Sequence, residues 1–396
     1  MIARARPKPK ETIESEDPPW DSEELLPSGD RIFSSIESGI RAAKHSIALE
    51  TYIFSDDRLG SRIEAALIEA AKRGVDVRVV VDGVGSQGWI FSVGGRLRAN
   101  GVNVKVYHQL PWERLFSDSS PWKALQSLTG LFLVINRRDH RKLCIIDGTL
   151  AWIGSTNITE LPLQADSGQS IRREIGMKVS GDGVKYLLGA FDLTWYPRIG
   201  RFHQERRRAR RLVHSSRFSA VRINSTIRLR IYHYNLLLRR INESAVRIWI
   251  ANAYFVPAGS FIDAITEAAR RGVDVRIVAS TQSDIFFMPW VHAAFQEALF
   301  KTGVKLYSYQ PGFLHAKYML IDDWAMVGSS NLNQRSLLHD LEADIMVKNP
   351  LTVEQLGQEY NIDVAQSSPL TSKTSVQFSW WQRLMGRLAL IFKHYI

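Results

Sequence analysis

Residues 70–82 read AAKRGVDVRVVVD and residues 268–280 read AARRGVDVRIVAS, so the chain contains two near copies of one stretch. Nine of these positions are identical at an offset of 198. Each copy holds the end of an amphipathic helix that closes near a glycine, followed by a β-branched run suited to a buried strand. Agreement at a fixed offset indicates an internal duplication.

The residues around both copies predict the same order of elements. Strand candidates that end in an aromatic residue precede the helices, IALETYIF in the first half and VRIWIANAYF in the second. A second helix and a short strand follow in each half, the strands reading GVNVKVY and GVKLYSY. Alternating strands and helices predict an α/β fold of two duplicated lobes, each a mostly parallel sheet flanked by helices, which face each other across one active site.

Changes in apolar and charged content along the chain predict the domain boundaries. Residues 1–27 lack the apolar segment of a signal peptide and are expected to form a disordered arm. We place the first lobe at 28–197, a basic linker at 198–225, and the second lobe with a C-terminal amphipathic helix at 226–396. The linker carries eight arginines from Arg198 to Arg217 and is interpreted as a solvated segment or exposed helix. Binding of anionic lipid phosphates or of nucleic acid by these arginines stays open as an alternative.

Two apolar segments have two interpretations each. Between Gly101 and His140 the first half has 27 more residues than the second has between Gly303 and His315. This insertion forms a lipid-facing lid or packs on its lobe, and its apolar residues are Trp112, Phe116, Trp122, Leu125 and Leu128. The C-terminal segment contacts a membrane or packs on its own lobe; its apolar positions at helical spacing are Trp381, Leu384, Leu388, Ile391 and Tyr395.

Charge and cysteine content narrow the class of protein. The chain of 396 residues has a formal net charge of +11, which favours a polyanionic partner, either nucleic acid or an anionic membrane surface. The single cysteine, Cys144, excludes an internal disulfide and lies in an apolar run typical of a buried thiol. The apolar stretches fall short of the roughly 18 residues of a spanning helix, so a soluble or surface-bound protein is expected.

One motif occurs once in each half. His140, Lys142 and Asp147 have the spacing H-x-K-x4-D and precede Gly154-Ser155-Thr156-Asn157. His315, Lys317 and Asp322 repeat it and precede Gly328-Ser329-Ser330-Asn331. Independent placement of these residue types gives only about 0.02 copies in a chain of this composition. Two copies at matching places in a duplication are therefore not accidental.

The spacing predicts which side chains meet. Residues two apart on a strand share a face, so each histidine and its lysine point the same way. Asp147-Gly148 predicts a two-residue hairpin that pairs 146 with 149, sets Ser155 opposite His140 and leaves Asn157 beside the histidine. In the second half a turn at 322–323 sets Ser330 opposite His315, with Asn331 next to it. Gly328 follows its aspartate by one residue fewer than Gly154 does, so a shorter turn is expected there.

This set of side chains suits a phosphodiester. Lysine ammonium groups and the amides of Asn157 and Asn331 would donate to non-bridging oxygens. One histidine would attack phosphorus while the other protonates the leaving alkoxide. We expect Glu174 to orient His140 and Glu342 to orient His315. Asp147 and Asp322 are interpreted as turn residues more than as participants. Ser155 and Ser329 are candidate phosphate donors, and no metal or other cofactor is required.

The paired motifs resemble the phospholipase D superfamily, over about residues 28–396. The flanks are similar to its cardiolipin synthase branch: SIALETYIF, AAKRGVDVRVVVDGVGS, NRRDHRKLCIIDG, NAYFVP, RGVDVRIV and GFLHAKYMLID. The resemblance implies transfer of a phosphatidyl group from one phosphatidylglycerol to another through a phosphatidyl-histidine, with release of glycerol. It favours His140 as nucleophile, which the spacing leaves open. The chain looks like the short synthases that lack N-terminal membrane helices.

Three other functions stay open. The same site would make a phospholipase if water were the acceptor, or a nuclease if it took nucleic acid, and a degenerate site would leave a membrane-binding protein. We expect an anionic phospholipid substrate, peripheral attachment to the cytoplasmic face of the cell membrane or a cytoplasmic location, and no nucleic-acid partner. One chain suffices for a complete site, and the oligomeric state is open.

Overall fold

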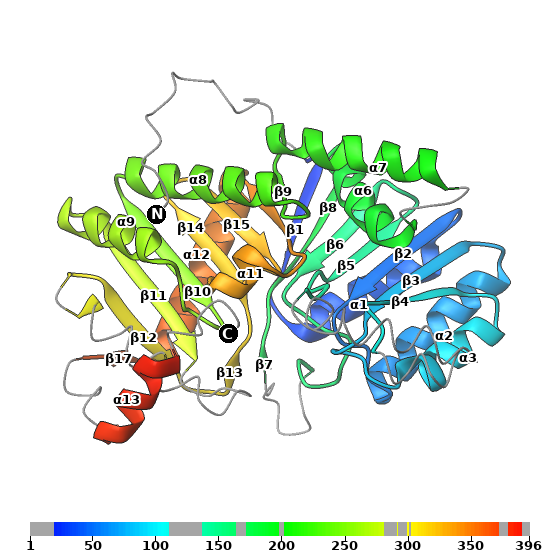
Figure 1. The fold of residues 1–396 in the computed structure, drawn as a ribbon, viewed down its shortest axis with the longest axis horizontal. Coiled ribbons are helices and arrows are strands. Elements are labelled where there is room, and N and C mark those ends of the chain that lie inside the picture. Colours follow the sequence, from blue (N-terminus) through cyan, green and yellow to red (C-terminus); the bar gives the residue numbers. More distant parts are fainter. Residues whose placement is uncertain are drawn as a thin grey trace.

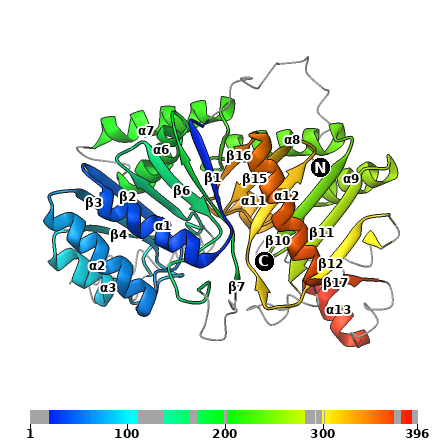
Figure 2. The ribbon, with the colours of Figure 1, turned by 180° about the vertical axis from the view of Figure 1, so that it is seen from behind.

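The computed structural model describes residues 20–110, 137–163, 172–197, 202–280, 291, 299–300, 302–371 and 379–389. Two α/β lobes lie side by side, the first lobe in blue to green and the second in green to orange (Figure 1). Each lobe is built on one large sheet with helices on both faces (Figures 1 and 2). The duplicated α/β architecture expected from the sequence is confirmed.

The first sheet has seven strands in the order β1-β8-β6-β5-β2-β3-β4. The neighbours β2, β3 and β4 are parallel, and the remaining pairs are antiparallel. The sheet is therefore mixed, because the motif strand β5 returns as a hairpin with β6. The strand bounds are β1 Ser22–Leu26, β2 Ser46–Thr51, β3 Asp76–Asp82, β4 Asn103–Tyr107, β5 Leu143–Ile146, β6 Leu150–Gly154 and β8 Gly176–Ser180.

The second sheet repeats this plan with eight strands in the order β17-β12-β11-β10-β14-β15-β16-β9. Strands β10, β11 and β12 are parallel and the others antiparallel. A short parallel pair, β7 (Arg172–Arg173) with β13 (Phe313–Leu314), joins the two lobes. The remaining bounds are β9 Val221–Ile223, β10 Arg247–Asn252, β11 Asp274–Ser280, β12 Lys305–Tyr309, β14 Lys317–Ile321, β15 Trp324–Gly328, β16 Ala343–Val347 and β17 Ser367–Leu370.

Helices cover both sheets. In the first lobe α1, α2 and α3 lie on one face and α6 on the other, with α7 packed on α6. One apolar cluster is continuous from α6 and the first sheet to the second sheet and α12, so the lobes share a core. The helix bounds are α1 Gly29–Ala42, α2 Arg58–Lys72, η1 Trp89–Phe91, α3 Val93–Ala99, α6 Val184–Trp195, α7 His203–Ser215, η2 Ser216–Phe218, α8 Ile227–Glu243, α9 Gly259–Arg270, α11 Gln334–Leu338, α12 Pro350–Ala365 and α13 Trp380–Ala389.

The repeated strand–helix–strand unit forms as the sequence predicts. The Asp57 side chain caps α2 by accepting a hydrogen bond from the Gly60 N–H. Gly74 follows the helix at φ 86°, and Gly272 follows α9 at φ 93°. A residue with a Cβ is strained at such angles, so the glycine of each copy ends its helix and directs the chain into β3 or β11.

Two expected boundaries are wrong. Residues 22–26, which were expected to belong to a disordered arm reaching Pro27, form β1 against β8, and the buried Trp20 donates its indole N–H to the Met346 carbonyl. The linker expected over 198–225 contains α7, which is the exposed helix that the sequence left open and buries only Ala209 and Val213. Its boundary at 225 is wrong, because β9 is already an edge strand of the second sheet. In both segments the apolar pattern spans only a few residues. It is therefore hard to distinguish from the charged sequence around it.

The first motif hairpin differs by one residue from the expected register. Ile146 pairs with Leu150 and not with residue 149, because the turn holds three residues, with Asp147 at φ 51° and Gly148 at φ 68°. Extending this register sets Thr156, not Ser155, opposite His140. In the second half Ile321 pairs with Trp324, so the shorter turn expected there is confirmed.

Candidate active site

The two motif histidines lie at the boundary between the lobes, held by backbone bonds from the opposite lobe. The His140 N–H donates to the Leu341 carbonyl at 2.9 Å, and the His315 N–H donates to the Arg173 carbonyl at 2.9 Å. Each histidine precedes its motif strand, beside the carboxyl ends of β2 or β10. Ligands bind at this end of parallel strands in open α/β sheets.

Each histidine is oriented by the glutamate of the other lobe. His140 Nδ1 lies 3.0 and 3.2 Å from the two carboxylate oxygens of Glu342, and His315 Nδ1 lies 2.7 Å from Glu174 Oε1. Both glutamates were expected to orient a histidine, but the expected partners, within one lobe, are wrong. Glu174 precedes β8 and Glu342 precedes β16, and these strands lie where the two sheets meet. The carboxylates therefore extend across the boundary.

The serines of the two Gly-Ser-x-Asn segments hold these carboxylates. The Ser155 hydroxyl donates to Glu174 Oε2, and the Ser329 hydroxyl donates to Glu342 Oε2. Their backbone N–H groups donate to the carbonyls of Ile175 and Ala343. Both serines are fully buried and their donors are occupied. The expectation that they bind phosphate is therefore wrong; they position the glutamates.

The two lysines lie in one shared electrostatic environment. Lys142 Nζ donates to the His140 carbonyl and Lys317 Nζ to the His315 carbonyl, each at 2.6 Å. Burial lowers the pKa of Lys142 to about 8 and that of Lys317 to about 7, although both glutamates act on each lysine in the opposite direction. Each ammonium is attracted electrostatically by the carboxylates of both lobes. We therefore treat the two His-Lys sets as a single centre.

Both imidazoles are neutral near pH 7. Burial, together with the nearby Lys142 and Lys317, lowers the pKa of His140 well below its ordinary value. Burial likewise lowers the pKa of His315 to about 3, against the attraction of Glu174. A neutral imidazole that donates from Nδ1 to a carboxylate keeps a lone pair on Nε2, which is the form of a nucleophile or a general base.

The two carboxylates differ in charge. Burial alone would raise the pKa of Glu174, but His315, Lys317 and Ser155 together lower it to about 2. Burial raises the pKa of Glu342 to about 7, and Lys142, Ser329 and Ser336 reduce that effect only in part. The His315–Glu174 pair therefore has an anionic carboxylate at neutral pH, while the pKa of Glu342 in the other pair lies close to neutral pH.

Comparison with known proteins gives a consistent result. Residues 36–181 and 237–364 match the family model described as cardiolipin synthase, PLD-like domain. A cardiolipin synthase of a Geobacillus strain is 30% identical over 357 residues, which cover 89% of this chain and 68% of that protein. Cardiolipin synthase B of Salmonella typhi is 30% identical over 378 residues, covering 93% of this chain and 87% of that protein.

The chain belongs to the phospholipase D superfamily. It falls in the cardiolipin synthase branch and is a phosphatidyltransferase of that superfamily. The solved phosphatidylserine synthase of Haemophilus influenzae has the same fold, with a TM-score of 0.67 at 13% identity over 94% of this chain and 95% of that one. The polyphosphate kinase of Porphyromonas gingivalis matches with a TM-score of 0.58 at 13% identity, over 90% of this chain and 49% of that one.

The motif aspartates of this superfamily member lie away from the centre. Asp147 accepts hydrogen bonds from the backbone N–H groups of residues 44, 45 and 46, and Asp322 accepts them from residues 245, 246 and 247. Asp147 and Lys142 lie at opposite ends of strand β5. At about 3.3 Å per residue, the distance between them along the strand is roughly 16 Å. The structure therefore does not support a catalytic role for these aspartates. It supports their interpretation as turn residues.

Replacing Asp147 by alanine should consequently affect stability more than chemistry. We expect the free energy of unfolding to fall by about 1–3 kcal/mol, because three backbone donors lose their acceptor. The kcat of the folded variant should change by less than about threefold. Urea unfolding and initial rates check this, with Asp182→Ala as the exposed control. A loss of activity without a loss of stability would contradict the assignment.

Three side chains near the histidines were not singled out from the sequence. The ring of Tyr52 contacts His140 edge-on at 5.2 Å between centroids, and Lys142 Nζ lies 5.5 Å from the same ring. Phe313 lies 5.7 Å from the His315 ring. Ser336 donates to Glu342 Oε1 at 2.8 Å. The strand candidate IALETYIF, which contains Tyr52 two residues before its final aromatic residue, was the available signal for Tyr52.

The two asparagines are buried beside their motifs. Asn157 Oδ1 accepts a hydrogen bond from the Ile53 N–H at 3.4 Å. Asn331 Oδ1 is buried and has no hydrogen-bond partner among the residues that the structure describes. Their role as phosphate donors remains a proposal.

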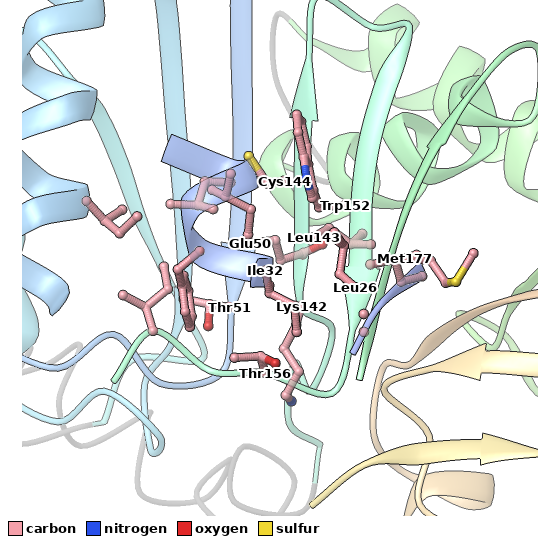
Figure 3. Close-up of a pocket in the computed structure, with 18 residues that line it drawn as sticks. Leu26, Ile32, Glu50, Thr51, Lys142, Leu143, Cys144, Trp152, Thr156 and Met177 are labelled. Carbon is pink, nitrogen blue, oxygen red and sulfur yellow. The ribbon is translucent and has the colours of Figure 1, made fainter. Parts of the chain in front are cut away.

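A small cavity lies behind Lys142, between α1 and the first sheet (Figure 3). Its volume is about 40 Å³, and its walls are mainly apolar, including Leu26, Ile32, Leu143 and Trp152. A space of this size is on the scale of water molecules and not of an acyl chain. We therefore regard it as a packing defect of the core and not as part of the substrate site.

Several expected features lie outside the described residues. These are the apolar side chains of the insertion at 111–136, and Ile391 and Tyr395 of the C-terminal segment. Within the described ranges, no helix combines the length and the apolar character needed to cross a bilayer.

Proposed function

We propose that this phosphatidyltransferase moves a phosphatidyl group from one phosphatidylglycerol to a second one, forming cardiolipin and glycerol. The observation that carries the proposal is the pair of neutral histidines, each bonded through Nδ1 to a glutamate of the other lobe, beside two lysines. The curated relatives are cardiolipin synthases, and they supply the donor and the acceptor in this proposal.

The first step forms a phosphatidyl-histidine. Nε2 of one imidazole attacks phosphorus, and the bond from phosphorus to the headgroup glycerol oxygen breaks. The leaving oxygen takes a proton from Nε2 of the other imidazole, which must first be protonated. The bound phosphodiester anion favours that protonation, because its charge raises the pKa of both imidazoles and both lysines. The family resemblance favours His140 as the nucleophile.

The second step reverses the roles. The imidazole that gave its proton is now neutral and accepts the proton of an acceptor hydroxyl. That oxygen attacks phosphorus, the bond from phosphorus to Nε2 breaks, and the first histidine is regenerated. Lys142, Lys317 and the amides of Asn157 and Asn331 would stabilise the non-bridging oxygens in both steps. With water as acceptor the product is phosphatidic acid, which is the second candidate function.

Product analysis tests the proposal. Purified protein with phosphatidylglycerol vesicles should yield cardiolipin and free glycerol in equal amounts, measured by mass spectrometry. Added glycerol should reverse the reaction and lower the cardiolipin yield. Phosphatidic acid as the sole product would replace the transferase by a phospholipase. Nicking of plasmid DNA with neither lipid product would replace it by a nuclease.

The reaction should weaken as pH rises. The ammonium forms of Lys317 and Lys142 predominate below their pKa values of about 7 and about 8, and deprotonation above these values removes attraction for the phosphate. We expect kcat/KM, which reports the free enzyme, to fall from about pH 7 upward and more steeply above about pH 8. Initial rates up to about pH 9.5 check this, and Lys142→Arg should move the upper limb to higher pH. A flat profile would contradict the role of the lysines.

Membrane attachment through α13 is part of the proposal. Trp380 and Trp381 are 77% and 46% exposed, and Leu384 and Met385 are 47% and 46% exposed. The helix lies at the edge of the second lobe (Figures 1 and 2). Exposed tryptophans on a basic amphipathic helix are typical of interfacial binding. Trp380→Ser with Trp381→Ser should weaken vesicle flotation, while hydrolysis or transfer in detergent micelles should persist.

A further inference from the structure

A large cleft opens on the α6 and α7 side of the first lobe, at its border with the second lobe. Its volume is about 840 Å³. It is bounded by β4, the carboxyl end of α6, the amino-terminal half of α7 and residues 225–226 of the second lobe. The volume lies in the range of small-molecule sites, about 300–1,000 Å³.

The charged groups that line this cleft are all basic. They are Lys105, Arg137, Arg206, Arg207 and Arg210, with His108 and His203 beside them. Among the described residues that line the cleft, there is no aspartate or glutamate. Thr226 and Ser225 add polar groups to the wall. A concave wall of one sign concentrates counter-ions of the other sign.

The cations are held by neutral groups. Lys105 Nζ donates to the carbonyls of Thr194 and Trp195 at 2.7 and 2.6 Å, and Arg206 donates to the carbonyls of Leu193 and Tyr196. These carbonyls are neutral groups and hold the Lys105 and Arg206 side chains at the wall of the cleft. Burial and then repulsion from Arg206 lower the pKa of Lys105, which an anion in the cleft would relieve. Arg137 Nε is buried and has no hydrogen-bond partner in the part of the chain that the structure describes.

We propose that this cleft is a second anion site, which takes the phosphate of an anionic lipid headgroup or of a small organophosphate. Two arginines one turn apart on α7, Arg207 and Arg210, line the same cleft as Lys105 and Arg137 and would supply charge-assisted donors to it. The proposal rests on the cleft and not on the identity of the reaction.

The cleft adjoins the segment that carries His140. Arg137 lies three residues before the histidine, and its guanidinium donates to the Ser225 carbonyl at 3.2 Å. Leu341, which also lines the cleft, accepts the backbone hydrogen bond of His140. An anion in the cleft would therefore lie near Leu341, whose carbonyl helps to position the first catalytic histidine. Occupancy by an anionic headgroup should change the apparent KM for lipid more than kcat.

Binding is tested on the full chain with the catalytic anion site silenced by Lys142→Met and Lys317→Met. Glycerol 1-phosphate, titrated by calorimetry, should bind one remaining site. Arg207→Ala with Arg210→Ala should weaken this binding by roughly tenfold or more. The matched control is Arg208→Ala with Arg211→Ala, which removes the same charge from α7 outside the cleft and should keep the affinity within about twofold. Equal losses in both pairs would overturn the proposal, because general charge would then explain them.

Two further ligands separate the sources. Phosphatidylglycerol vesicles that bind less tightly to the Arg207→Ala, Arg210→Ala variant than to its control identify the lipid headgroup, and unchanged vesicle binding with weakened glycerol 1-phosphate binding identifies a soluble organophosphate. Absence of glycerol 1-phosphate binding, with an oligonucleotide bound through Arg207 and Arg210, would overturn the site in favour of a nucleic-acid surface. Melting temperatures of all variants show whether each is folded.

Discussion

Replacing His140 by alanine is expected to lower the rate of phosphatidyl transfer by at least about 10⁴-fold, and replacing His315 to lower it as much. In the proposed mechanism both steps need both imidazoles, one for the bond to phosphorus and the other for the proton. The double variant should therefore be about as impaired as either single variant, since the two groups act as a unit. Lys142 and Lys317 remain in each variant, so lipid binding should persist.

Cardiolipin formation from labelled phosphatidylglycerol, followed over hours, measures this loss. The control is His45→Ala, because His45 is exposed and its contact with Asp147 comes from its backbone N–H, which alanine retains. The control should keep its rate within about twofold. A single histidine variant that retains more than about a tenth of the activity would show that one imidazole alone carries the chemistry.

Replacing Glu174 by glutamine is expected to lower kcat by about 10²- to 10⁴-fold through His315, the histidine of the opposite lobe. The amide is neutral and its NH₂ group can face Nδ1. The variant therefore no longer favours the tautomer with a proton on Nδ1, and it no longer stabilises the imidazolium by charge. Glu342→Gln should act in the same way on His140. Because the surroundings of Glu174 lower its pKa to about 2 and burial raises the pKa of Glu342 to about 7, the Glu174 variant should lose more activity.

Nitrogen-15 spectra of the histidine side chains test the crossed partners directly. Glu174→Gln should shift the ring nitrogens of His315 and leave those of His140 near their original positions, and Glu342→Gln should do the reverse. Resonances are assigned with His140→Ala and His315→Ala. Ser155→Ala, which removes one donor to Glu174, should shift His315 by a smaller amount. Shifts confined to the histidine of the same lobe as the altered glutamate would contradict the structure.

The duplication and the residues of the site were predictable from the sequence, because local patterns carried them. The copies at 70–82 and 268–280 gave the strand–helix–strand unit, and the two H-x-K-x4-D motifs gave His140, Lys142, His315 and Lys317. These inferences depend on spacing within a short segment. Such spacing is retained whatever the rest of the chain does.

The errors came from features that spacing does not encode. Glu174 and Glu342 were found, but the choice of histidine depends on how the lobes face each other. The first hairpin was misplaced by one residue because Asp147 and Gly148 both take positive φ in a three-residue turn. Strand β1 was missed because its partner β8 lies about 150 residues away in the sequence. The charged residues in and around β1 also make it look unlike a strand.

Rapid-quench trapping with labelled phosphatidylglycerol, followed by peptide mapping, tests whether one imidazole from each lobe acts on a single phosphorus atom. The account predicts an acid-labile adduct on one histidine per chain, either His140 or His315, and loss of that adduct when the labelled histidine is replaced. It also predicts that replacing the other histidine slows both formation and discharge. Turnover without a covalent adduct, or an adduct on any other residue, would contradict it.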